Sequence, residues 1–385
     1  MNAFNLKKSV AAVVLAGLSM VGAAASAQDV IGGGATLPQG LYNSLFPNLT
    51  DDFAYTGVGS GAGRRAILNN DSDEFKVGGV PVYSPKVRVD FSGSDAALRE
   101  SELDTYNTRY NNGAASTIAD FGPIIQVPAV VTSVTLPYRH ATINNLNLTD
   151  AQICGIYAGT ITNWSQIVTG AAGTIDVVYR TEGSGTTELL AKFLDAQCSQ
   201  NFQVSDSFAT VVANVGGVRA NWIGVTGSGG VASTTLAANN RIGYVSPDYV
   251  NVDSNTNVAR VRGALPSVQN VKNMLVVTPA APATTAYGNP LAWSPNFTYP
   301  PIPNAYPILG FTNLLVGQCY DDAAGESVAE FLTTIYGSDD IVEDHDFVPL
   351  SPAWKNAATA AFLTASSDLA IGNATECAGK GRTQP

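Results

Sequence analysis

The sequence predicts an α/β fold with two lobes, each built on a largely parallel sheet. Short strand-like runs are repeatedly followed by small and hydroxyl-bearing residues and then by a run with helical spacing. This order is typical of parallel sheets, in which helices connect neighbouring strands. The chain has 385 residues, which is more than one hydrophobic core usually organises, so two lobes are expected.

The expected elements follow from hydrophobic spacing and from β-branched content. Residues 247–307 are rich in Pro, Asn and Ala and are expected to form long surface loops with little regular structure. The run 124–136 is β-branched and mostly apolar, which predicts a buried strand. Further strands are expected at 54–58, 87–91, 175–179 and 241–245, and helices at 41–46, 64–68, 96–103 and 187–196.

Four junctions share one pattern: a tight turn of Gly, Ser, Thr or Ala that leads into a helix. They are residues 33–38, 59–63, 92–96 and 180–187. Helix N-termini offer free backbone N–H groups and a partial positive charge, and ligands bind beyond the carboxyl ends of parallel strands. If the four turns meet, they can hold a compact anion without a basic pocket.

The turn Ser184-Gly185-Thr186, with Arg180 before it, is the sharpest of these patterns. Glycine lets the backbone approach a ligand closely, and an arginine can pair with an oxyanion through two hydrogen bonds. The alternative is an ordinary capped helix after a strand. No lysine follows the glycines, so the turn is not a phosphate-binding P-loop, and Glu182 stands where a nucleophile elbow needs glycine.

Asp95 is an unusual residue for an anion site, and its plain role would be an acidic residue near a helix N-terminus. If it faces a ligand oxygen, that oxygen must carry a proton. Phosphate carries such a proton at neutral pH and sulfate does not, so Asp95 is expected to select against sulfate.

The N-terminus predicts export. Lys7 and Lys8 precede an apolar run that ends in Ala25-Ser26-Ala27, which is typical of a signal peptide covering residues 1–27 and cleaved near Ala27. The alternative is a membrane anchor, but the apolar run is short. Removing the two lysines takes the net charge from −11 to −13. This balance argues against nucleic acid and anionic membranes as partners.

The four cysteines are compatible with two disulfides in an exported protein. Three pairings are possible, and sequence proximity favours Cys154–Cys198 and Cys319–Cys377. The chain has only two histidines, His140 and His345, and no CxxC spacing, so no metal site, cofactor or catalytic residue is assigned.

Taken together and in order, these loops resemble the phosphate-binding proteins of bacterial ABC transporters, and most closely the DING family of exported phosphate-binding proteins. The resemblance extends from Asp29 to the C-terminus, although the chain reads Asp29-Val30-Ile31-Gly32 where the family has Asp-Ile-Asn-Gly. All four cysteines fall where the family has its two disulfides. The motifs that carry the resemblance are residues 32–39, 58–61, 93–95, 178–189, 306–314, 362–367 and 379–382.

The resemblance implies a two-lobe, type II periplasmic-binding-protein fold that closes on the anion around two crossing strands. The implied crossings lie near 126–131 and 305–310, so lobe one comprises 29–125 plus 311–385 and lobe two 126–310. The implied phosphate ligands are Thr36, Leu37, Ser60, Asp95, Arg180, Ser184, Gly185 and Thr186.

The function implied is high-affinity binding of inorganic phosphate for uptake or scavenging by a periplasmic or secreted monomer, with an ABC-type phosphate permease as the partner. Two alternatives stay open. One is a secreted phosphatase, because some members of this family are associated with phosphomonoesterase activity. The other is an extracellular adhesion protein that keeps the fold without transport.

Overall fold

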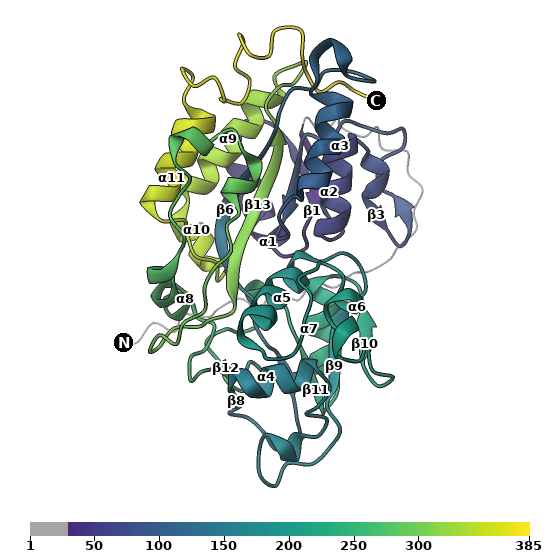
Figure 1. Cartoon of the computed structure of the whole chain (residues 1–385), viewed down its shortest axis with the longest axis vertical. Helices are drawn as coiled ribbons and strands as arrows, with labels where there is room; N and C mark the ends of the chain where they lie inside the picture. The colour runs from purple at the N-terminus through teal and green to yellow at the C-terminus, as the bar shows by residue number, and fades with distance from the viewer. Residues whose placement is uncertain (1–29) are drawn as a thin grey trace, which may run out of the picture.

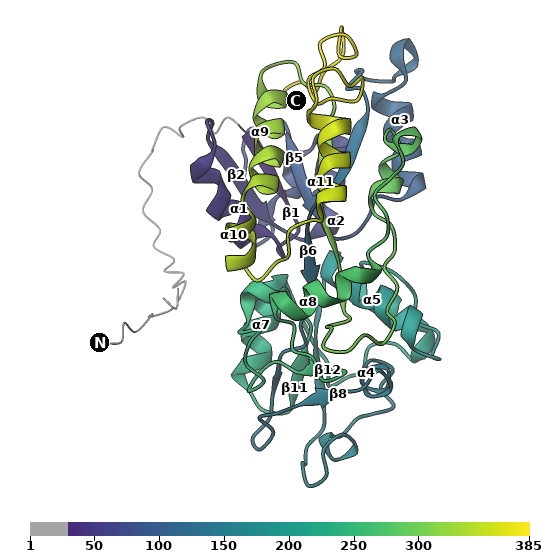
Figure 2. The same ribbon diagram turned by 90° about the vertical axis from the view of Figure 1, so that its left-hand side faces the viewer.

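The computed structural model describes residues 30–385, which form two lobes stacked along the long axis of the molecule (Figures 1 and 2). The signal peptide predicted at residues 1–27 lies outside the described residues. We call the upper body in Figure 1 the larger-sheet lobe and the lower body the smaller-sheet lobe, after their central sheets. Between residues 30 and 385, no helix combines the length and the apolar character needed to cross a bilayer.

The larger-sheet lobe is built on five strands in the order β2-β1-β5-β13-β6. Strands β2, β1 and β5 are parallel, whereas β13 runs antiparallel to both β5 and β6. Every residue of β1, β5, β6 and β13 is buried, as expected for a sheet covered on both faces. The strands are β1 (Val30–Gly34), β2 (Phe53–Gly57), β5 (Phe91–Ser94), β6 (Ile124–Ser133) and β13 (Leu309–Gly317).

Helices cover both faces of this sheet, and Figure 1 shows α9 and α11 on one side of it and α2 and α3 on the other. On the first face the rings of Tyr42 and Phe331 are 5.2 Å apart, and Phe331 lies 5.4 Å from Phe91 of β5. On the second face Ile67 and Tyr106 belong to a separate apolar cluster. The helices are α1 (Gln39–Leu45), α2 (Ser60–Asn69), α3 (Glu100–Tyr110), α9 (Ala324–Gly337), α10 (Asp339–Asp344) and α11 (Pro352–Ala358).

The smaller-sheet lobe has four strands in the order β10-β9-β11-β7, of which the first three are parallel and β7 is antiparallel. The largely parallel sheet expected in each lobe is therefore confirmed for the smaller sheet, whereas the larger sheet is mixed, with two parallel and two antiparallel ladders. The strands are β7 (Tyr138–Arg139), β9 (Asp176–Arg180), β10 (Ile223–Val225) and β11 (Arg241–Gly243), with a separate parallel pair, β8 (Asn147–Leu148) and β12 (Arg260–Val261). The helices are α4 (Asp150–Tyr157), α5 (Gly185–Gln197), α6 (Phe208–Val211) and α7 (Gly227–Ala237).

Strands β6 and β13 carry the chain between the lobes. They pair along their full length in the larger sheet, from Ile124 opposite Gly317 to Ser133 opposite Leu309, with a bulge at Thr312. Beyond this ladder, Val134 N–H donates to the Ile308 carbonyl at 2.8 Å, and the chain continues toward β7. The residue boundaries expected for the lobes, at 125/126 and 310/311, stay a prediction.

The remaining elements are short. Residues 247–307 contain β12 and α8 (Val268–Met274) together with four 3-10 turns, so the expectation of mostly irregular structure there is largely confirmed. A small hairpin joins β3 (Lys76–Val77) and β4 (Val80–Pro81). The helical turns are η1 (Phe46–Asn48), η2 (Ser72–Glu74), η3 (Gly113–Ala115), η4 (Trp164–Gln166), η5 (Ala213–Val215), η6 (Pro247–Tyr249), η7 (Leu275–Val277), η8 (Thr284–Ala286), η9 (Pro290–Trp293) and η10 (Thr359–Leu363).

Two expected elements begin later than the sequence suggested. The strand expected at 87–91 is β5, Phe91–Ser94, and the helix expected at 96–103 is α3, which starts at Glu100. Residues 95–98 are not helical because side chains from distant parts of the chain accept their amide hydrogens. Asp95 N–H donates to Ser60 Oγ at 3.2 Å and Leu98 N–H to Gln126 Oε1 at 2.7 Å.

Both disulfides favoured by sequence proximity are present. Cys154–Cys198 joins α4 to the residue that caps α5, with Cα atoms 5.6 Å apart. Cys319–Cys377 joins the segment after β13 to the C-terminal region, with Cα atoms 5.3 Å apart. Each crosslink therefore stabilises one lobe and leaves the connection between the lobes uncrosslinked.

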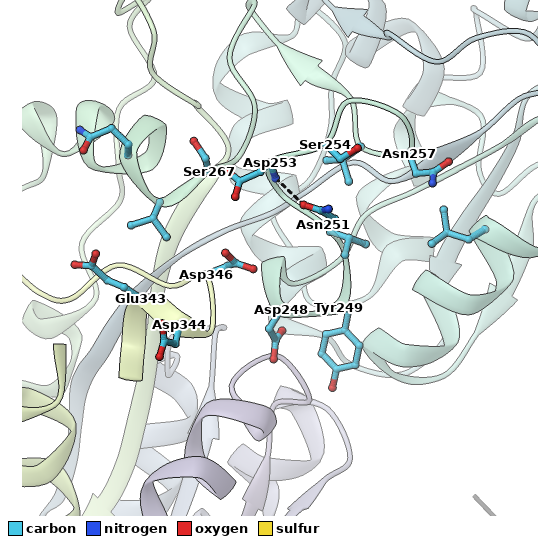
Figure 3. Close-up of a pocket in the computed structure, with 15 residues that line it drawn as sticks. Asp248, Tyr249, Asn251, Asp253, Ser254, Asn257, Ser267, Glu343, Asp344 and Asp346 are labelled. Carbon is cyan, nitrogen blue, oxygen red and sulfur yellow. Dashed lines mark hydrogen bonds between the residues drawn. The ribbon is translucent and has the colours of Figure 1, made fainter. Parts of the chain in front are cut away.

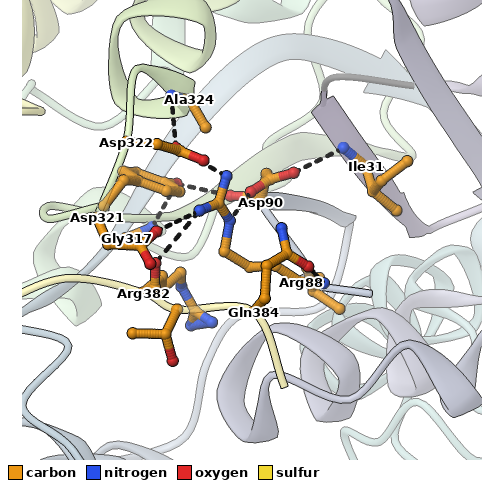
Figure 4. Close-up of polar contacts among 12 residues, drawn as sticks. Ile31, Arg88, Asp90, Gly317, Asp321, Asp322, Ala324, Arg382 and Gln384 are labelled. Carbon is orange, nitrogen blue, oxygen red and sulfur yellow. Dashed lines mark hydrogen bonds and ion pairs between the residues drawn. The ribbon is translucent and has the colours of Figure 1, made fainter. Parts of the chain in front are cut away.

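A buried arginine anchors the end of the larger sheet that lies away from the smaller-sheet lobe (Figure 4). The Arg88 guanidinium pairs with Asp90 at 2.5 Å, Asp321 at 2.6 Å and Asp322 at 2.9 Å. Asp90 in turn accepts a hydrogen bond from Ile31 N–H of β1 at 2.8 Å, and the Gln384 side chain accepts from Arg88 N–H at 3.1 Å. This cluster therefore joins the entry to β5, strand β1 and the C-terminal tail at one end of the larger sheet.

Candidate functional site

The four turns that the sequence singled out come together between the lobes. The larger-sheet lobe contributes Thr36 and Leu37 after β1, Ser60 after β2 and Asp95 after β5, all at carboxyl ends of parallel strands. The smaller-sheet lobe contributes Arg180, the last residue of β9, and the turn that opens α5. Thr36, Ser60, Asp95, Arg180, Ser184 and Thr186 are all buried. The structure therefore brings the four turns together, as the sequence led us to expect.

Ser60 joins the two sides of this cleft. It stands at the first position of α2, and its Oγ accepts one hydrogen bond from Asp95 N–H at 3.2 Å and one from Gly185 N–H at 3.1 Å. Asp95 belongs to the same lobe as Ser60, whereas Gly185 belongs to the other. With both lone pairs engaged, the Ser60 hydroxyl hydrogen is left as a donor toward the cleft and the Asp95 carboxylate.

Close backbone approach explains the glycines. A Cβ atom on Gly185 would lie 2.4 Å from the Asp95 Cβ, a distance at which the two turns could not meet. Gly61 N–H donates to the Gly183 carbonyl at 3.0 Å, and a Cβ on Gly61 would lie 3.2 Å from the Gly183 Cα. The glycines in these turns therefore allow the two lobes to touch directly.

Thr36 meets a fifth turn, which the sequence analysis did not single out. Its Oγ1 lies 3.0 Å from Ser228 Oγ and accepts from Ser228 N–H at 3.2 Å. Ser228 lies in the first turn of α7, and Tyr249 O–H donates to the Thr36 carbonyl at 3.0 Å from the same lobe. The missed signal was present: Gly227-Ser228-Gly229 follows the short strand β10 in the same pattern as the other four turns.

Arg180 is held in a fixed orientation at the end of β9. Its guanidinium pairs with Glu182, with Nε 2.6 Å from Oε1, and Glu182 also accepts from Gly227 N–H at 2.8 Å. The remaining Nη1 points toward Ser228 Oγ at 3.4 Å. Only 3% of Arg180 is exposed, so its charge acts inside the cleft with little screening by solvent.

Asp95 is a buried acceptor whose charge is disfavoured. Burial raises the pKa of its carboxyl to about 7, while the nearby Thr312 hydroxyl and the charge of Arg180 oppose the rise. Its Oδ1 atom has no hydrogen-bond partner among the described residues, and the same holds for the buried hydroxyl of Thr186. Such unpartnered polar atoms are costly in a protein interior, and they fit a ligand that carries both oxygens and a hydrogen.

Helix N-termini add to the positive potential of the cleft. Helices α2, α5 and α7 begin at Ser60, Gly185 and Gly227, each within the group of turns described above. Their free N–H groups and dipoles favour an anion although the chain as a whole is acidic. The arrangement can therefore bind a small tetrahedral oxyanion by short-range hydrogen bonds.

An open cavity of about 1200 Å³ is a separate feature (Figure 3). Its lining includes Asp248, Asp253, Glu343, Asp344 and Asp346 and none of the eight predicted phosphate ligands. These carboxylates would repel an anion. No group of three or more His, Cys, Asp or Glu between residues 30 and 385 is placed to hold a metal ion.

Sequence comparison connects this geometry to known proteins. Residues 16–337 match the family model described as a PBP superfamily domain. A Pseudomonas aeruginosa PAO1 protein named alkaline phosphatase L is 42% identical over 386 residues, covering 98% of this chain and 99% of that protein. A phosphate-binding protein from an unknown prokaryotic organism is 41% identical over 394 residues, covering 92% of this chain and 100% of that protein.

Solved structures that resemble this chain are also phosphate-binding proteins. A high-affinity periplasmic phosphate-binding protein, PfluDING, bound with phosphate at pH 8.5, superposes with a TM-score of 0.82 at 40% identity and covers 92% of this chain and 99% of its own. A phosphate-binding protein from Stenotrophomonas maltophilia superposes with a TM-score of 0.82 at 36% identity, with 92% and 99% coverage.

The raised pKa of Asp95 makes a prediction about stability. In the folded protein this carboxyl keeps its proton up to about pH 7, whereas in the unfolded chain it loses the proton near 3.8. Its contribution to stability is therefore complete below pH 4 and is lost as the pH rises toward 7. Asn does not titrate, so Asp95→Asn should stabilise the ligand-free protein by on the order of 2–4 kcal/mol above pH 7 and by much less near pH 4.

Urea unfolding of phosphate-free protein across this pH range measures the effect. The exposed Asp104 of α3 offers a matched control, and Asp104→Asn should show no such trend with pH. If the difference in unfolding free energy between Asp95→Asn and the native chain does not change with pH, the pKa of Asp95 is not raised by burial.

Proposed function

The chain belongs to the PBP superfamily and to the DING family of phosphate-binding proteins, and we propose that it binds inorganic phosphate in the cleft between its lobes. The observation that carries the proposal is the buried, unpartnered Oδ1 of Asp95 beside the Arg180 guanidinium and a group of free donors. HPO4 has oxygens that accept hydrogen bonds from Arg180 and the free donors, and it has one hydrogen to donate to the Asp95 carboxylate. The proposed ligands are Thr36, Leu37, Ser60, Asp95, Arg180, Ser184, Gly185 and Thr186, to which the geometry adds Ser228.

Each group has a distinct task in this proposal. Arg180 supplies a charge-assisted pair to two phosphate oxygens, and the hydroxyls and amides of the turns replace the water that phosphate loses. The Asp95 carboxylate accepts the hydrogen of the P–OH group. Since sulfate has no such hydrogen at neutral pH, it would place an oxygen lone pair against a buried carboxylate, and this repulsion gives the selectivity.

Binding by lobe closure follows from the placement of these groups. The ligands come from both lobes, and the lobes are connected through β6 and β13 without a disulfide between them. Hinged closure is a common way for two-lobe proteins to surround a ligand. In the closed form, Gly185 N–H reaches Ser60 and Gly61 N–H reaches Gly183.

The proposed setting is the periplasm or the extracellular medium. The signal-peptide pattern ending at Ala27 supports export, and the similar PfluDING is a periplasmic phosphate-binding protein. In this setting the protein acts as a monomer that captures phosphate for uptake or scavenging. An ABC-type permease that accepts phosphate from the closed form is the proposed partner.

A second candidate function is hydrolysis of phosphate monoesters in the same cleft. It is favoured by the 42% identity to a protein named alkaline phosphatase L. The same groups that would bind HPO4 could bind the phosphoryl group of an ester. A phosphatase would cleave many ester molecules per protein molecule, whereas a protein that captures phosphate reversibly would cleave none.

Calorimetry on phosphate-free protein tests binding directly. The native chain should bind one phosphate, and Arg180→Ala should weaken binding by about tenfold or more, because a charged hydrogen bond contributes about 1.5–3 kcal/mol. Arg180→Lys keeps the charge without the paired geometry and should retain part of the affinity. Native affinity in Arg180→Ala would move the site elsewhere.

Selectivity tests the role of Asp95. At pH 8, where this carboxyl is mostly ionised, the native chain should bind phosphate and discriminate strongly against sulfate. Asp95→Asn should reduce the ratio of the two affinities by about tenfold or more, since Asn can donate a hydrogen bond to sulfate. An unchanged ratio in competition titrations would refute the proton-acceptor role.

Release of p-nitrophenol from its phosphate ester distinguishes the two functions. For a binding protein, purified native chain and Arg180→Ala should show the same background rate. Sustained release by the native chain that is lost in Arg180→Ala, purified in the same way, would establish hydrolysis in this cleft.

A further inference from the structure

An ion-pair bridge crosses the cleft beside the anion site without contributing to it. Asp206 of the smaller-sheet lobe lies just before α6, and its two carboxylate oxygens bind two arginines of the larger-sheet lobe. Oδ2 lies 2.8 Å from Arg64 Nη2, and Oδ1 lies 2.9 Å from Arg99 Nη2. The side chain of Arg64 is 3% exposed and that of Asp206 is 12% exposed, so the first pair is well shielded from water.

One end of this bridge belongs to a helix that carries a proposed phosphate ligand, and the other end is hydrogen-bonded to a turn that carries such ligands. Arg64 lies four residues after Ser60 on α2, which places the two side chains on the same face of the helix. Asp206 itself accepts a hydrogen bond at its backbone carbonyl from Ser184 N–H at 2.9 Å. The bridge therefore joins the turn that opens α5 to the helix that carries Ser60.

We infer that Asp206 is a closure residue, whose carboxylate pairs with Arg64 and Arg99 only when the lobes are closed and so increases phosphate affinity without contacting phosphate. The inference rests on the proposed function, because it concerns the closed form that surrounds the anion. A group that binds one of two conformations shifts the equilibrium by its differential interaction with them.

The surroundings of the bridge allow it to open. Arg64 also donates from Nε to Glu102 of its own lobe at 3.1 Å, so this arginine keeps a partner when Asp206 moves away. The side chain of Arg99 is 47% exposed and returns to water. The larger-sheet lobe therefore loses little on its own when the bridge breaks.

The charge of Asp206 is secure at ordinary pH. Burial by itself would raise the pKa of this carboxyl, but Arg64 and Arg99 more than offset burial and lower it. The facing charges are Arg64, Arg99 and, beyond Arg64, Glu102. The bridge thus remains ionised around neutral pH, where phosphate carries one or two hydrogens.

Phosphate binding and the stability of the ligand-free protein, measured together, test the inference. Asp206→Asn should weaken phosphate binding by about 10-fold to 100-fold, mainly through faster release in stopped-flow experiments. Unfolding of the ligand-free variant should stay close to that of the native chain, and the ratio of phosphate to sulfate affinity should not change. Arg99→Gln, at an exposed position, should show the same pattern with a smaller loss.

Asp150→Asn provides the matched control. Asp150 pairs with Arg262 at 2.7 Å within the smaller-sheet lobe, where the two side chains are 29% and 14% exposed. This variant should reduce stability in both ligand states and leave phosphate release unchanged.

Three outcomes overturn the inference. Native affinity and release rate in Asp206→Asn would show that the bridge does not contribute to closure. A loss of stability in the ligand-free variant as large as the loss in binding would make Asp206 a structural residue. A native chain that does not bind phosphate would refute the proposed function itself, and the native sample alone reveals that failure.

Discussion

The hydroxyl oxygen of Ser60 is the atom on which the cleft depends. It receives the amide hydrogens of Asp95 and Gly185, at 3.2 and 3.1 Å, and these residues come from turns on opposite lobes. Without that oxygen two buried N–H groups would lack an acceptor, which is costly in a protein interior. This one shared acceptor fixes the turn of Asp95 against the start of α5, and the other contacts between the lobes, such as Gly61 N–H with the Gly183 carbonyl, lie around it.

The cleft also shows how an acidic protein can hold an anion. The chain carries a net charge of −11, and the large cavity beside the cleft is lined by carboxylates. Inside the cleft, one buried arginine and the N-termini of α2, α5 and α7 attract the anion over a few ångströms. Solvent screens these electrostatic interactions little because the groups are buried. Specificity can therefore come from local hydrogen-bond geometry, while the overall charge keeps the protein soluble and discourages adventitious anions.

Most of the fold and much of the candidate site could be predicted from the sequence because the information is local. Strands followed by Gly, Ser and Thr turns, and cysteines close in sequence, led to parallel sheets and two disulfides that the structure contains. Ser228 follows the same local pattern and could have been found. The late start of α3 could not, because Ser60 and Gln126 bind the amides of residues 95–98 from distant positions. Likewise, the bridge from Arg64 to Asp206 joins residues 142 positions apart, which no local pattern indicates.

The buried Arg88 cluster has a practical consequence for attaching labels. Gln384 and Arg382 accept hydrogen bonds from Arg88, so the C-terminal tail is anchored at the end of the larger sheet. A fusion joined directly to Pro385 would therefore strain the contacts around Arg88. The β3–β4 hairpin behaves oppositely: its Val77 and Val80 side chains are 65% and 66% exposed. A fluorophore or surface tether is better carried at one of these exposed positions, where it leaves the Arg88 cluster undisturbed.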